Sequence, residues 1–290
     1  MIDLKLCDIG VIREILSRHG FHFSKSLGQN FLCAPHVPVA IAEGAGIEEE
    51  TNVLEVGPGI GTLTQELCKR AKKVVCVELD HRLPAVLAET LAEFNNVKVI
   101  EGDILKTDLR ALCDKEFSAG KIVACANLPY YITTPAITAL VDSRCFDAVT
   151  VMVQKEVARR ICSKPGSSEY GAFTVYVQYH AQAKIILDVP AGCFIPAPKV
   201  DSAVVRLDLR KEPPAFVEDE EMFFRVVKAA FAQRRKTLLN CLRQGFSQLS
   251  REQLCQCLLQ SGLAENVRGE CLGLEEFAAL AKNIAEISGK

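Results

Sequence analysis

Five short apolar segments rich in β-branched residues recur about 20–25 residues apart in the first half of the chain. Stretches with the spacing of amphipathic helices separate them, as at residues 83–94. Near-continuous apolar strands that alternate with helices are typical of a parallel sheet covered on both faces. We therefore predict an α/β fold, with strands at residues 52–57, 73–79, 97–103, 121–127 and 148–154.

Two more strand candidates, residues 183–190 and 202–209, follow this series. A late pair of strands often forms an antiparallel edge, so we expect a mostly parallel seven-stranded sheet. Residues 210–221 are charged and contain two adjacent prolines, which predicts a linker, and the patterns beyond it are helical. We predict an α/β domain at residues 1–212, with an N-terminal helical extension over about residues 1–35, and an all-helical domain at residues 213–290.

Composition excludes several classes of protein. The chain is 49% hydrophobic and 24% charged, and no apolar run reaches the roughly 18 residues of a membrane span. The first residues lack the layout of a signal peptide, so we expect a cytoplasmic protein without a membrane segment. Most of the thirteen cysteines are isolated and no C-x-x-C pair occurs, so we expect free thiols and no metal site.

The ends of the first three predicted strands carry residues suited to a ligand. Gly57 and Gly59 lie in the turn EVGPGIGTL (55–63), where glycine lets the backbone approach a ligand closely. Glu78 lies 21 residues after Gly57, the spacing at which a carboxylate meets ribose hydroxyls. Asp103, at the third strand end, could accept a hydrogen bond from an adenine amino group. Solvated carboxylates are the simpler alternative, but consecutive strand ends favour a ligand site.

Two nucleosides fit these residues, NAD and S-adenosylmethionine. The turn reads G-P-G-I-G-T-L rather than G-x-G-x-x-G, which disfavours a dinucleotide whose pyrophosphate rests on a helix N-terminus. The fourth strand adds to this discrimination, because it leads into NLPYYITTP (127–135), a sequence for which a dehydrogenase has no use.

The segment NLPY suits methylation of an exocyclic amine. The nitrogen lone pair of such an amine is delocalised into the ring, so the site must accept hydrogen bonds from its N–H groups. Asn127 offers a side-chain oxygen, and Pro129 restricts Leu128 to an extended conformation that aims its carbonyl inward. Tyr130 offers a face on which a base stacks. Positioning and electrostatics then carry most of the catalysis, although a turn with buried tyrosines is the simpler alternative.

Long segments of the chain resemble one family. They include KSLGQNFL (25–32), EVGPGIGTLT (55–64), NLPYYITTP (127–135), FIPAPKVDSAVVRL (194–207) and AFAQRRKTLLNCL (230–242). Over nearly its whole length the chain is similar to small-subunit ribosomal RNA adenine N6,N6-dimethyltransferases of the KsgA (RsmA) type. The resemblance implies a Rossmann-like class I S-adenosylmethionine-dependent methyltransferase. It would dimethylate two adjacent adenosines in a hairpin loop near the 3′ end of 16S rRNA, late in 30S subunit biogenesis, after flipping each base out of its stack.

The resemblance also implies roles for individual residues. The acceptor site would comprise Asn127, Leu128, Pro129, Tyr130 and Phe194, with Phe194 stacked on the flipped base. Cofactor contacts would come from Asn30, Leu32, Gly57, Gly59, Glu78, Leu79, Asp103, Ile104 and Asn127. Cys33 and Ala34 depart from the family pattern, which more often has a polar or acidic residue there, and this puts helix capping at that point in doubt.

One segment is strongly basic although the net charge of the chain is −2. Residues 225–243 contain six Lys or Arg and no acid, which favours contacts with RNA phosphates, although a solvated helix face is the common alternative. The candidate RNA-binding residues are Lys25, Arg225, Lys228, Arg234, Arg235 and Lys236. We expect a monomer whose partner is the small-subunit rRNA within a structured 30S particle.

Other functions stay open. A large-subunit rRNA adenine dimethyltransferase of the antibiotic-resistance type shares NLPY and the cofactor motifs. A non-catalytic assembly-checkpoint protein would hold an immature particle and would need no methyl transfer. An NAD-dependent dehydrogenase is the remaining alternative, and it would require saturable NADH binding.

Overall fold

The computed structural model describes residues 5–21, 28–214 and 216–289. The chain divides into two compact units. The first, which we call the sheet unit, comprises Met1–Ala158 and Lys184–Leu209. The second, the helical unit, comprises Arg159–Ala183 and Arg210–Lys290.

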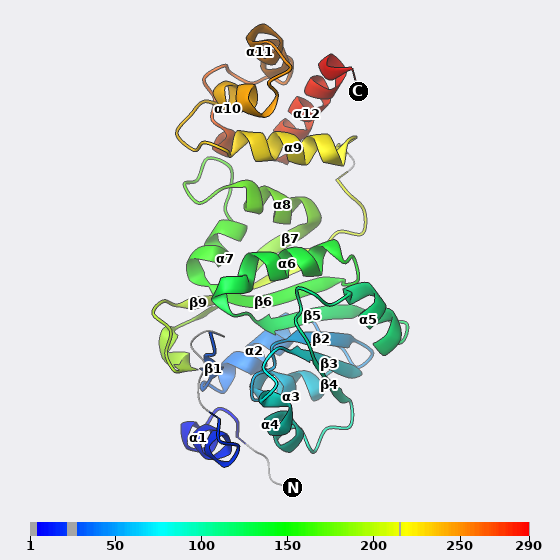
Figure 1. Cartoon of the computed structure of the whole chain (residues 1–290), viewed down its shortest axis with the longest axis vertical. Coiled ribbons are helices and arrows are strands. Elements are labelled where there is room, and N and C mark those ends of the chain that lie inside the picture. Colours follow the sequence, from blue (N-terminus) through cyan, green and yellow to red (C-terminus); the bar gives the residue numbers. More distant parts are fainter. Residues whose placement is uncertain (1–4, 22–27, 215, 290) are drawn as a thin grey trace. The chain divides into compact units, whose positions relative to one another are not determined.

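A seven-stranded sheet forms the centre of the sheet unit, in the order β4-β3-β2-β5-β6-β9-β7 (Figure 1). Neighbouring strands from β4 to β6 are parallel, and β9 pairs antiparallel with β6. The predicted α/β fold with a mostly parallel seven-stranded sheet is therefore confirmed. The strands are β2 (Asn52–Val56), β3 (Lys73–Glu78), β4 (Val97–Glu101), β5 (Ile122–Asn127), β6 (Ala148–Gln154), β7 (Ala181–Val189) and β9 (Ser202–Leu209).

The strand order creates a site for a ligand. From β2 the chain moves outward to β3 and β4, and it then returns to pair β5 with the other side of β2. Between β2 and β5 the direction of progression reverses, and ligands of open α/β sheets bind at the carboxyl ends of the strands at such a point. The two central strands are buried throughout or nearly so, which explains their continuous apolar sequences.

Helices connect the strands and cover the sheet. Figure 1 labels α1 (Ile9–Arg18), α2 (His36–Gly44), α3 (Thr62–Cys68), α4 (Leu83–Thr90), α5 (Leu109–Glu116), α6 (Thr133–Asp142) and α7 (Lys155–Ile161). The Asp8 carboxylate caps α1 by accepting from the N–H groups of Gly10 and Val11. The start of α2 has no side-chain cap, in keeping with the departure from the family pattern at Cys33 and Ala34.

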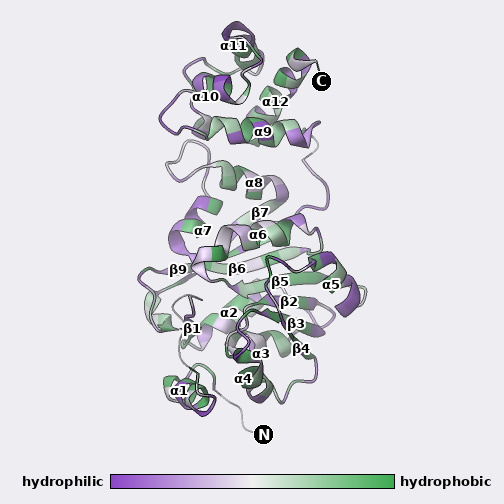
Figure 2. Cartoon of the chain, in the orientation of Figure 1, coloured by the Kyte–Doolittle hydropathy of each residue, from purple (hydrophilic) through white to green (hydrophobic). Residues whose placement is uncertain are grey.

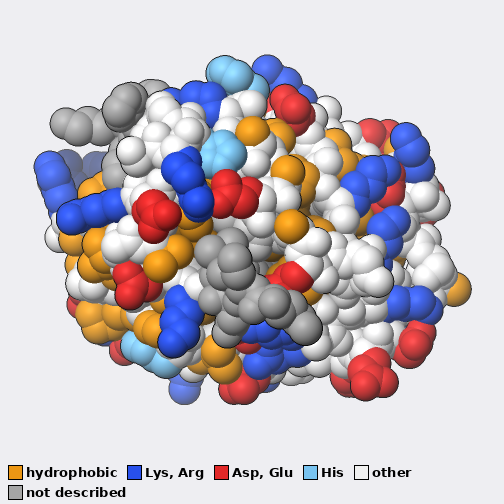
Figure 3. All heavy atoms as spheres, turned by 90° about the horizontal axis from the view of Figure 1, so that it is seen from below, with side chains coloured by type: hydrophobic (Ala, Val, Ile, Leu, Met, Phe, Trp, Pro, Cys, Tyr) orange, Lys and Arg blue, Asp and Glu red, His pale blue; other side chains and the backbone are white. Residues whose placement is uncertain are grey.

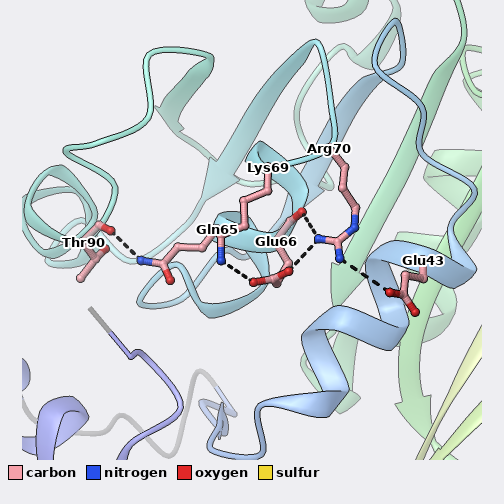
Figure 4. Close-up of polar contacts among 6 residues, drawn as sticks. All are labelled: Glu43, Gln65, Glu66, Lys69, Arg70 and Thr90. Carbon is pink, nitrogen blue, oxygen red and sulfur yellow. Dashed lines mark hydrogen bonds and ion pairs between the residues drawn. The ribbon is translucent and has the colours of Figure 1, made fainter. Parts of the chain in front are cut away.

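Polar contacts tie α3 to its neighbours (Figure 4). Glu66 accepts from Lys69 and Arg70, which follow the end of the helix, at 2.7 and 2.6 Å, and Arg70 also lies 3.8 Å from Glu43 of α2. The buried side chain of Gln65 donates to the Thr90 carbonyl at the end of α4. These contacts fix the helix that follows the glycine-rich turn.

The helical unit has its own apolar core. Its helices are α8 (Ala172–His180), α9 (Glu220–Ala230), α10 (Leu238–Gly245), α11 (Arg251–Gln260) and α12 (Leu274–Ser288). Figure 2 shows hydrophobic and hydrophilic residues interspersed along α9 and α12, the pattern of helices with one face in a core. The unit includes residues 159–183, which the sequence pattern assigned to the α/β domain, because Tyr170 and Tyr179 pack in the same core as Phe223.

The structure also contains a separate two-stranded sheet. It pairs β1 (Phe31–Leu32) antiparallel with β8 (Phe194–Ile195), with Phe31 opposite Ile195 and Leu32 opposite Phe194. Segments more than 150 residues apart in the sequence thus meet. Among the residues that the structure describes, no helix has the length and apolarity to cross a membrane.

Candidate active site

A pocket of about 230 Å³ opens at the carboxyl ends of β2, β3, β4 and β5. The structure brings together there all thirteen of the predicted cofactor and acceptor residues. They are Asn30, Leu32, Gly57, Gly59, Glu78, Leu79, Asp103, Ile104, Asn127, Leu128, Pro129, Tyr130 and Phe194. The pocket lies where the strand order predicts a ligand site.

The glycine-rich turn forms one wall of the pocket. Gly57 and Gly59 have φ values of 67° and 61°, a left-handed conformation that favours glycine. A Cβ on Gly59 would lie 3.1 Å from a ring carbon of Phe31, so a larger residue would also displace that ring. The turn therefore needs glycine for its backbone conformation and for its close contact with Phe31 of β1.

Glu78, at the end of β3, is buried and held by backbone groups. One carboxylate oxygen accepts from the Asp80 N–H at 2.8 Å, and the other lies 3.4 Å from the Gly59 nitrogen. Burial raises the pKa of this carboxyl, and these two hydrogen bonds oppose that effect. The contact with Gly59 couples the carboxylate to the glycine-rich turn.

Asp103 follows β4 and is partly exposed. Its Oδ1 accepts from the Leu105 N–H at 3.0 Å, and its Oδ2 lies 3.7 Å from the Lys106 ammonium. The neighbouring Gly102 donates its N–H to the carbonyl of Glu78, at 2.8 Å. The two acidic strand ends thus form one continuous rim of the pocket.

Asn127, the last residue of β5, is oriented by the segment before β1. Its Nδ2 donates to the Asn30 carbonyl at 3.2 Å. The opposite end of the amide, Oδ1, is then an acceptor, and no partner for it is found in the described part of the chain. Leu128 is buried and anchored by its N–H to the Met152 carbonyl, and Pro129 is extended, with φ −55° and ψ 133°. The turn is therefore held in place at the pocket, which Asn127, Leu128 and Pro129 all line.

Two aromatic residues also line the pocket, Tyr130 and Phe194. The Tyr130 hydroxyl lies 2.8 Å from the Ser202 hydroxyl of β9, which holds the ring in place. Phe194 is 5% exposed and is fixed by the pairing of β8 with β1. Tyr131, which the sequence reading did not single out, also lines the pocket and is 58% exposed.

The pocket has a distinct electrostatic character. Glu55, Glu78 and Asp103 line it, and no Lys, Arg or His is found among its described lining residues. Carboxylates favour a cationic ligand, such as one with sulfonium and ammonium groups, and disfavour the pyrophosphate of a dinucleotide. The side chains present therefore fit S-adenosylmethionine better than NAD.

Glu55 is a pocket residue that the sequence reading missed. It lies within β2, is 1% exposed, and accepts from the Cys76 thiol at 3.5 Å. Burial raises the pKa of Glu55 to about 7. The available signal was an acid within a predicted buried strand, since a buried carboxylate without a cationic partner is costly and is a candidate functional group.

Glu55 makes stability depend on pH. Its folded pKa of about 7 lies above the ordinary value of 4.5, so its contribution is greatest below pH 4.5 and is lost as the pH rises to 7. Ionisation of Glu55 should lower the free energy of unfolding of the wild type by about 3 kcal/mol as the pH rises from 4.5 to above 7. We expect Glu55→Gln to lack this decrease. Urea unfolding of both proteins at several pH values measures it, with exposed Glu93→Gln as the control. A pH profile for Glu55→Gln that parallels the wild type would contradict the assignment.

The sequence also did not predict a set of contacts around Asp80, which follows β3 at the rim of the pocket. Gln29 donates to Asp80 Oδ2 at 2.7 Å, and Arg82 pairs with the same carboxylate at 2.6 Å. Hydrogen bonds from the Arg82 side chain are the largest cause that lowers the pKa of Asp80 to about 2. The segment before β1 is thereby attached to the end of β3 as well as to Asn127.

The predicted RNA-binding residues lie mainly in the helical unit, and Lys25 lies outside the described residues. The Arg225 guanidinium lies 4.5 Å from the Phe246 ring centroid, and Arg234 donates to the Ser168 carbonyl. The exposed Lys228, Arg235 and Lys236 form no ion pair within the described residues. In contrast, the face of the molecule in Figure 3 shows basic and acidic side chains interspersed.

Among the described residues, no group of three or more His, Cys, Asp or Glu is arranged to hold a metal ion. All thirteen cysteines are free thiols.

Comparison with known proteins gives a consistent result. The family model described as ribosomal RNA adenine dimethylase matches residues 20–286. The ribosomal RNA small subunit methyltransferase A of Geobacillus thermodenitrificans is 48% identical over 276 residues, which cover 94% of each chain. A dimethyladenosine transferase from Plasmodium falciparum has a TM-score of 0.74 at 27% identity, covering 89% of this chain and 98% of that one. The 23S rRNA methyltransferase ErmE has a TM-score of 0.68 at 27% identity, covering 88% and 99%.

Proposed function

The chain belongs to the ribosomal RNA adenine dimethylase family, and we propose that it dimethylates N6 of two adjacent adenosines near the 3′ end of small-subunit rRNA. The methyl donor is S-adenosylmethionine, whose sulfonium supplies an electrophilic methyl group when it is bound. The observation that carries the proposal is the orientation of Asn127, whose Nδ2 is held by the Asn30 carbonyl. An acceptor oxygen is thereby presented next to an acidic pocket that suits a cationic cofactor.

Residues of the strand ends would hold the cofactor. We assign the ribose hydroxyls to Glu78 and the adenine amino group to Asp103, both of which line the pocket. Gly57 and Gly59 would allow the backbone to contact the methionine portion. Asn30, Leu32, Leu79 and Ile104 would close the remaining sides of the site.

Asn127 and Leu128 would act on the target amine. The Asn127 Oδ1 and the Leu128 carbonyl accept its two N–H groups, which draws the nitrogen toward a pyramidal geometry and frees its lone pair. No strong general base is required, because the N–H becomes acidic once the nitrogen is alkylated. Preorganised acceptors of this kind cost no reorganisation during the reaction.

Tyr130 and Phe194 would bind the target base between them. An adenine within a helix or a stack cannot reach the pocket, so each nucleotide must be flipped out of the RNA. The hydrogen bond between Tyr130 and Ser202 and the pairing of β8 with β1 fix the two rings before the base arrives. Base stacking on such rings contributes about 1–3 kcal/mol.

The exposed cations of the helical unit would position the RNA. We expect Arg235→Gln with Lys236→Gln to lower affinity for the small subunit about tenfold at 0.1 M salt and to reduce the log–log salt slope by about 1–2. Affinity for S-adenosylmethionine should not change. The control is Arg110→Gln with Lys115→Gln, an exposed pair on α5. Equal losses in the two double variants would show that this segment has no special role.

A large-subunit target is the main alternative within the family. The similarity to ErmE extends over 88% of this chain, so the fold does not separate the two substrates. The 48% identity to a small-subunit methyltransferase favours the small subunit. A monomer in the cytoplasm, acting on a 30S particle, fits this assignment. A checkpoint role in assembly would be compatible with the same active site.

A comparison of three RNA substrates tests the proposal. Purified protein and labelled S-adenosylmethionine would be incubated with unmodified small subunits, large subunits and protein-free rRNA in parallel. The proposal predicts methyl transfer to small subunits in preference to the other two. Preferential labelling of large subunits would support the resistance-type assignment, and binding to small subunits without any transfer would support a checkpoint protein.

A further inference from the structure

Two cysteines face each other at the end of the strand pair that borders the pocket. Cys33 directly follows β1 and Cys193 directly precedes β8. The register of Leu32 opposite Phe194 extends to them, and the Cys33 N–H donates to the Cys193 carbonyl at 2.8 Å. Both thiols are partly exposed, so a small oxidant can reach them.

Their separation suits a disulfide. Opposed residues of an antiparallel pair have Cα atoms about 4.5–5.5 Å apart, and disulfides span about 4.4–6.8 Å between Cα atoms. The Cys33 Sγ lies 3.8 Å from the carbonyl oxygen of Gly192, beside Cys193. Burial, and next the Cys193 thiol, raise the pKa of Cys33, which places the two thiols within electrostatic reach of each other.

The residues attached to this pair are those of the pocket. Leu32 and Phe194 line it, and the Asn30 carbonyl holds Asn127. Phe31 lies against the position of the Gly59 Cβ. Separation of β1 from β8 would therefore change one wall of the pocket.

We propose that Cys33 and Cys193 are a site of reversible oxidation, and that their disulfide clamps β1 to β8 and slows cofactor exchange. One thiolate attacks hydrogen peroxide to give a sulfenic acid and hydroxide, which takes up a proton. The second thiol displaces water from that sulfur, so two thiols and one peroxide give a disulfide and two waters. The effect on turnover rests on the proposed function, because four methyl transfers require repeated cofactor exchange, whereas the disulfide itself does not.

Three other thiols test the selectivity of the pairing. The Cys33 thiol is one of the causes, after burial, that raise the pKa of Cys7 to about 11, so Cys7 is a rival partner for Cys33. Cys113 and Cys145 form a separate pair, since the Cys145 thiol contributes, after burial, to raising the pKa of Cys113 to about 12. Neither Cys113 nor Cys145 is among the residues that line the pocket.

The experiment combines peptide mapping with a release rate. Full-length wild type, Cys193→Ser and Cys145→Ser would be treated with hydrogen peroxide at about pH 8.5, where more thiolate is present. Non-reducing mass spectrometry would map the cross-links, and stopped flow would measure the dissociation of S-adenosylhomocysteine. We expect a Cys33–Cys193 cross-link, with dissociation slowed roughly tenfold in wild type and Cys145→Ser. Dithiothreitol should restore the rate, and Cys193→Ser should not respond.

Several results would overturn the proposal. They are the absence of the cross-link, a Cys7–Cys33 cross-link in its place, a cross-link without change in dissociation, and equal slowing in Cys193→Ser. Failure of the proposed function would look different, because the reduced wild type would then transfer no methyl groups to small subunits while its cross-link could still be mapped.

Discussion

Asn127→Ala is expected to lower the rate of methyl transfer to small subunits by about 10²–10³-fold, the size of effect typical of removing one preorganised hydrogen-bonding group from an active site. The substitution removes the Oδ1 acceptor and also the Nδ2 contact with the Asn30 carbonyl. Asn127 is at the end of a strand and is only partly buried, so the fold should persist. The measurement is the single-turnover rate at saturating cofactor, together with thermal unfolding of both proteins.

The control is Asn95→Ala, which removes an exposed amide between α4 and β4. It should transfer methyl groups at the wild-type rate. Asn127→Asp adds a finer test, since it keeps an acceptor oxygen but cannot donate to Asn30. We expect Asn127→Asp to be impaired as well. Near-normal transfer by Asn127→Ala would mean that this amide does not hold the target amine.

Glu78→Gln is expected to weaken cofactor binding by about 10–100-fold, because a hydrogen bond to a charged group contributes about 1.5–3 kcal/mol. The replacement has nearly the same shape but removes the charge and turns one acceptor atom into a donor. That donor would face the N–H of Gly59 or of Asp80, both of which the carboxylate now accepts. Calorimetric titration with S-adenosylmethionine measures the change.

The chain offers a matched control in Glu101→Gln. Glu101 pairs in register with Glu78 on the neighbouring strand, but it is exposed and does not line the pocket. Its replacement should leave the affinity for the cofactor unchanged. If the two variants bind S-adenosylmethionine equally well, Glu78 does not hold the ribose.

Strand ends were the part of the site that sequence could predict. Gly57, Glu78, Asp103 and Asn127 each follow or end an apolar segment, and parallel strands bring their carboxyl ends to one edge of a sheet. Their proximity in the structure could therefore be predicted although they lie far apart in the sequence. The fold class followed from the same alternation of strands and helices.

Contacts between distant segments were beyond the sequence pattern. Nothing local to Tyr130 indicates Ser202 as its partner, 72 residues later, because a single hydroxyl contact leaves no periodic signal. The same holds for the pairing of β1 with β8, since each strand has only two residues. Residues 159–183 looked like part of the α/β domain because burial of Tyr170 and Tyr179 in the helical core depends on the tertiary structure.

The most direct measurement is nucleoside mass spectrometry of rRNA from unmodified small subunits incubated with the protein and S-adenosylmethionine. We predict N6,N6-dimethyladenosine at two adjacent positions near the 3′ end of the rRNA, with four methyl groups transferred per particle. When Asn127→Ala replaces the wild type, dimethyladenosine should form about 10²–10³-fold more slowly. No dimethyladenosine from active, cofactor-binding wild-type protein, or dimethyladenosine in large-subunit rRNA alone, would contradict the proposed function.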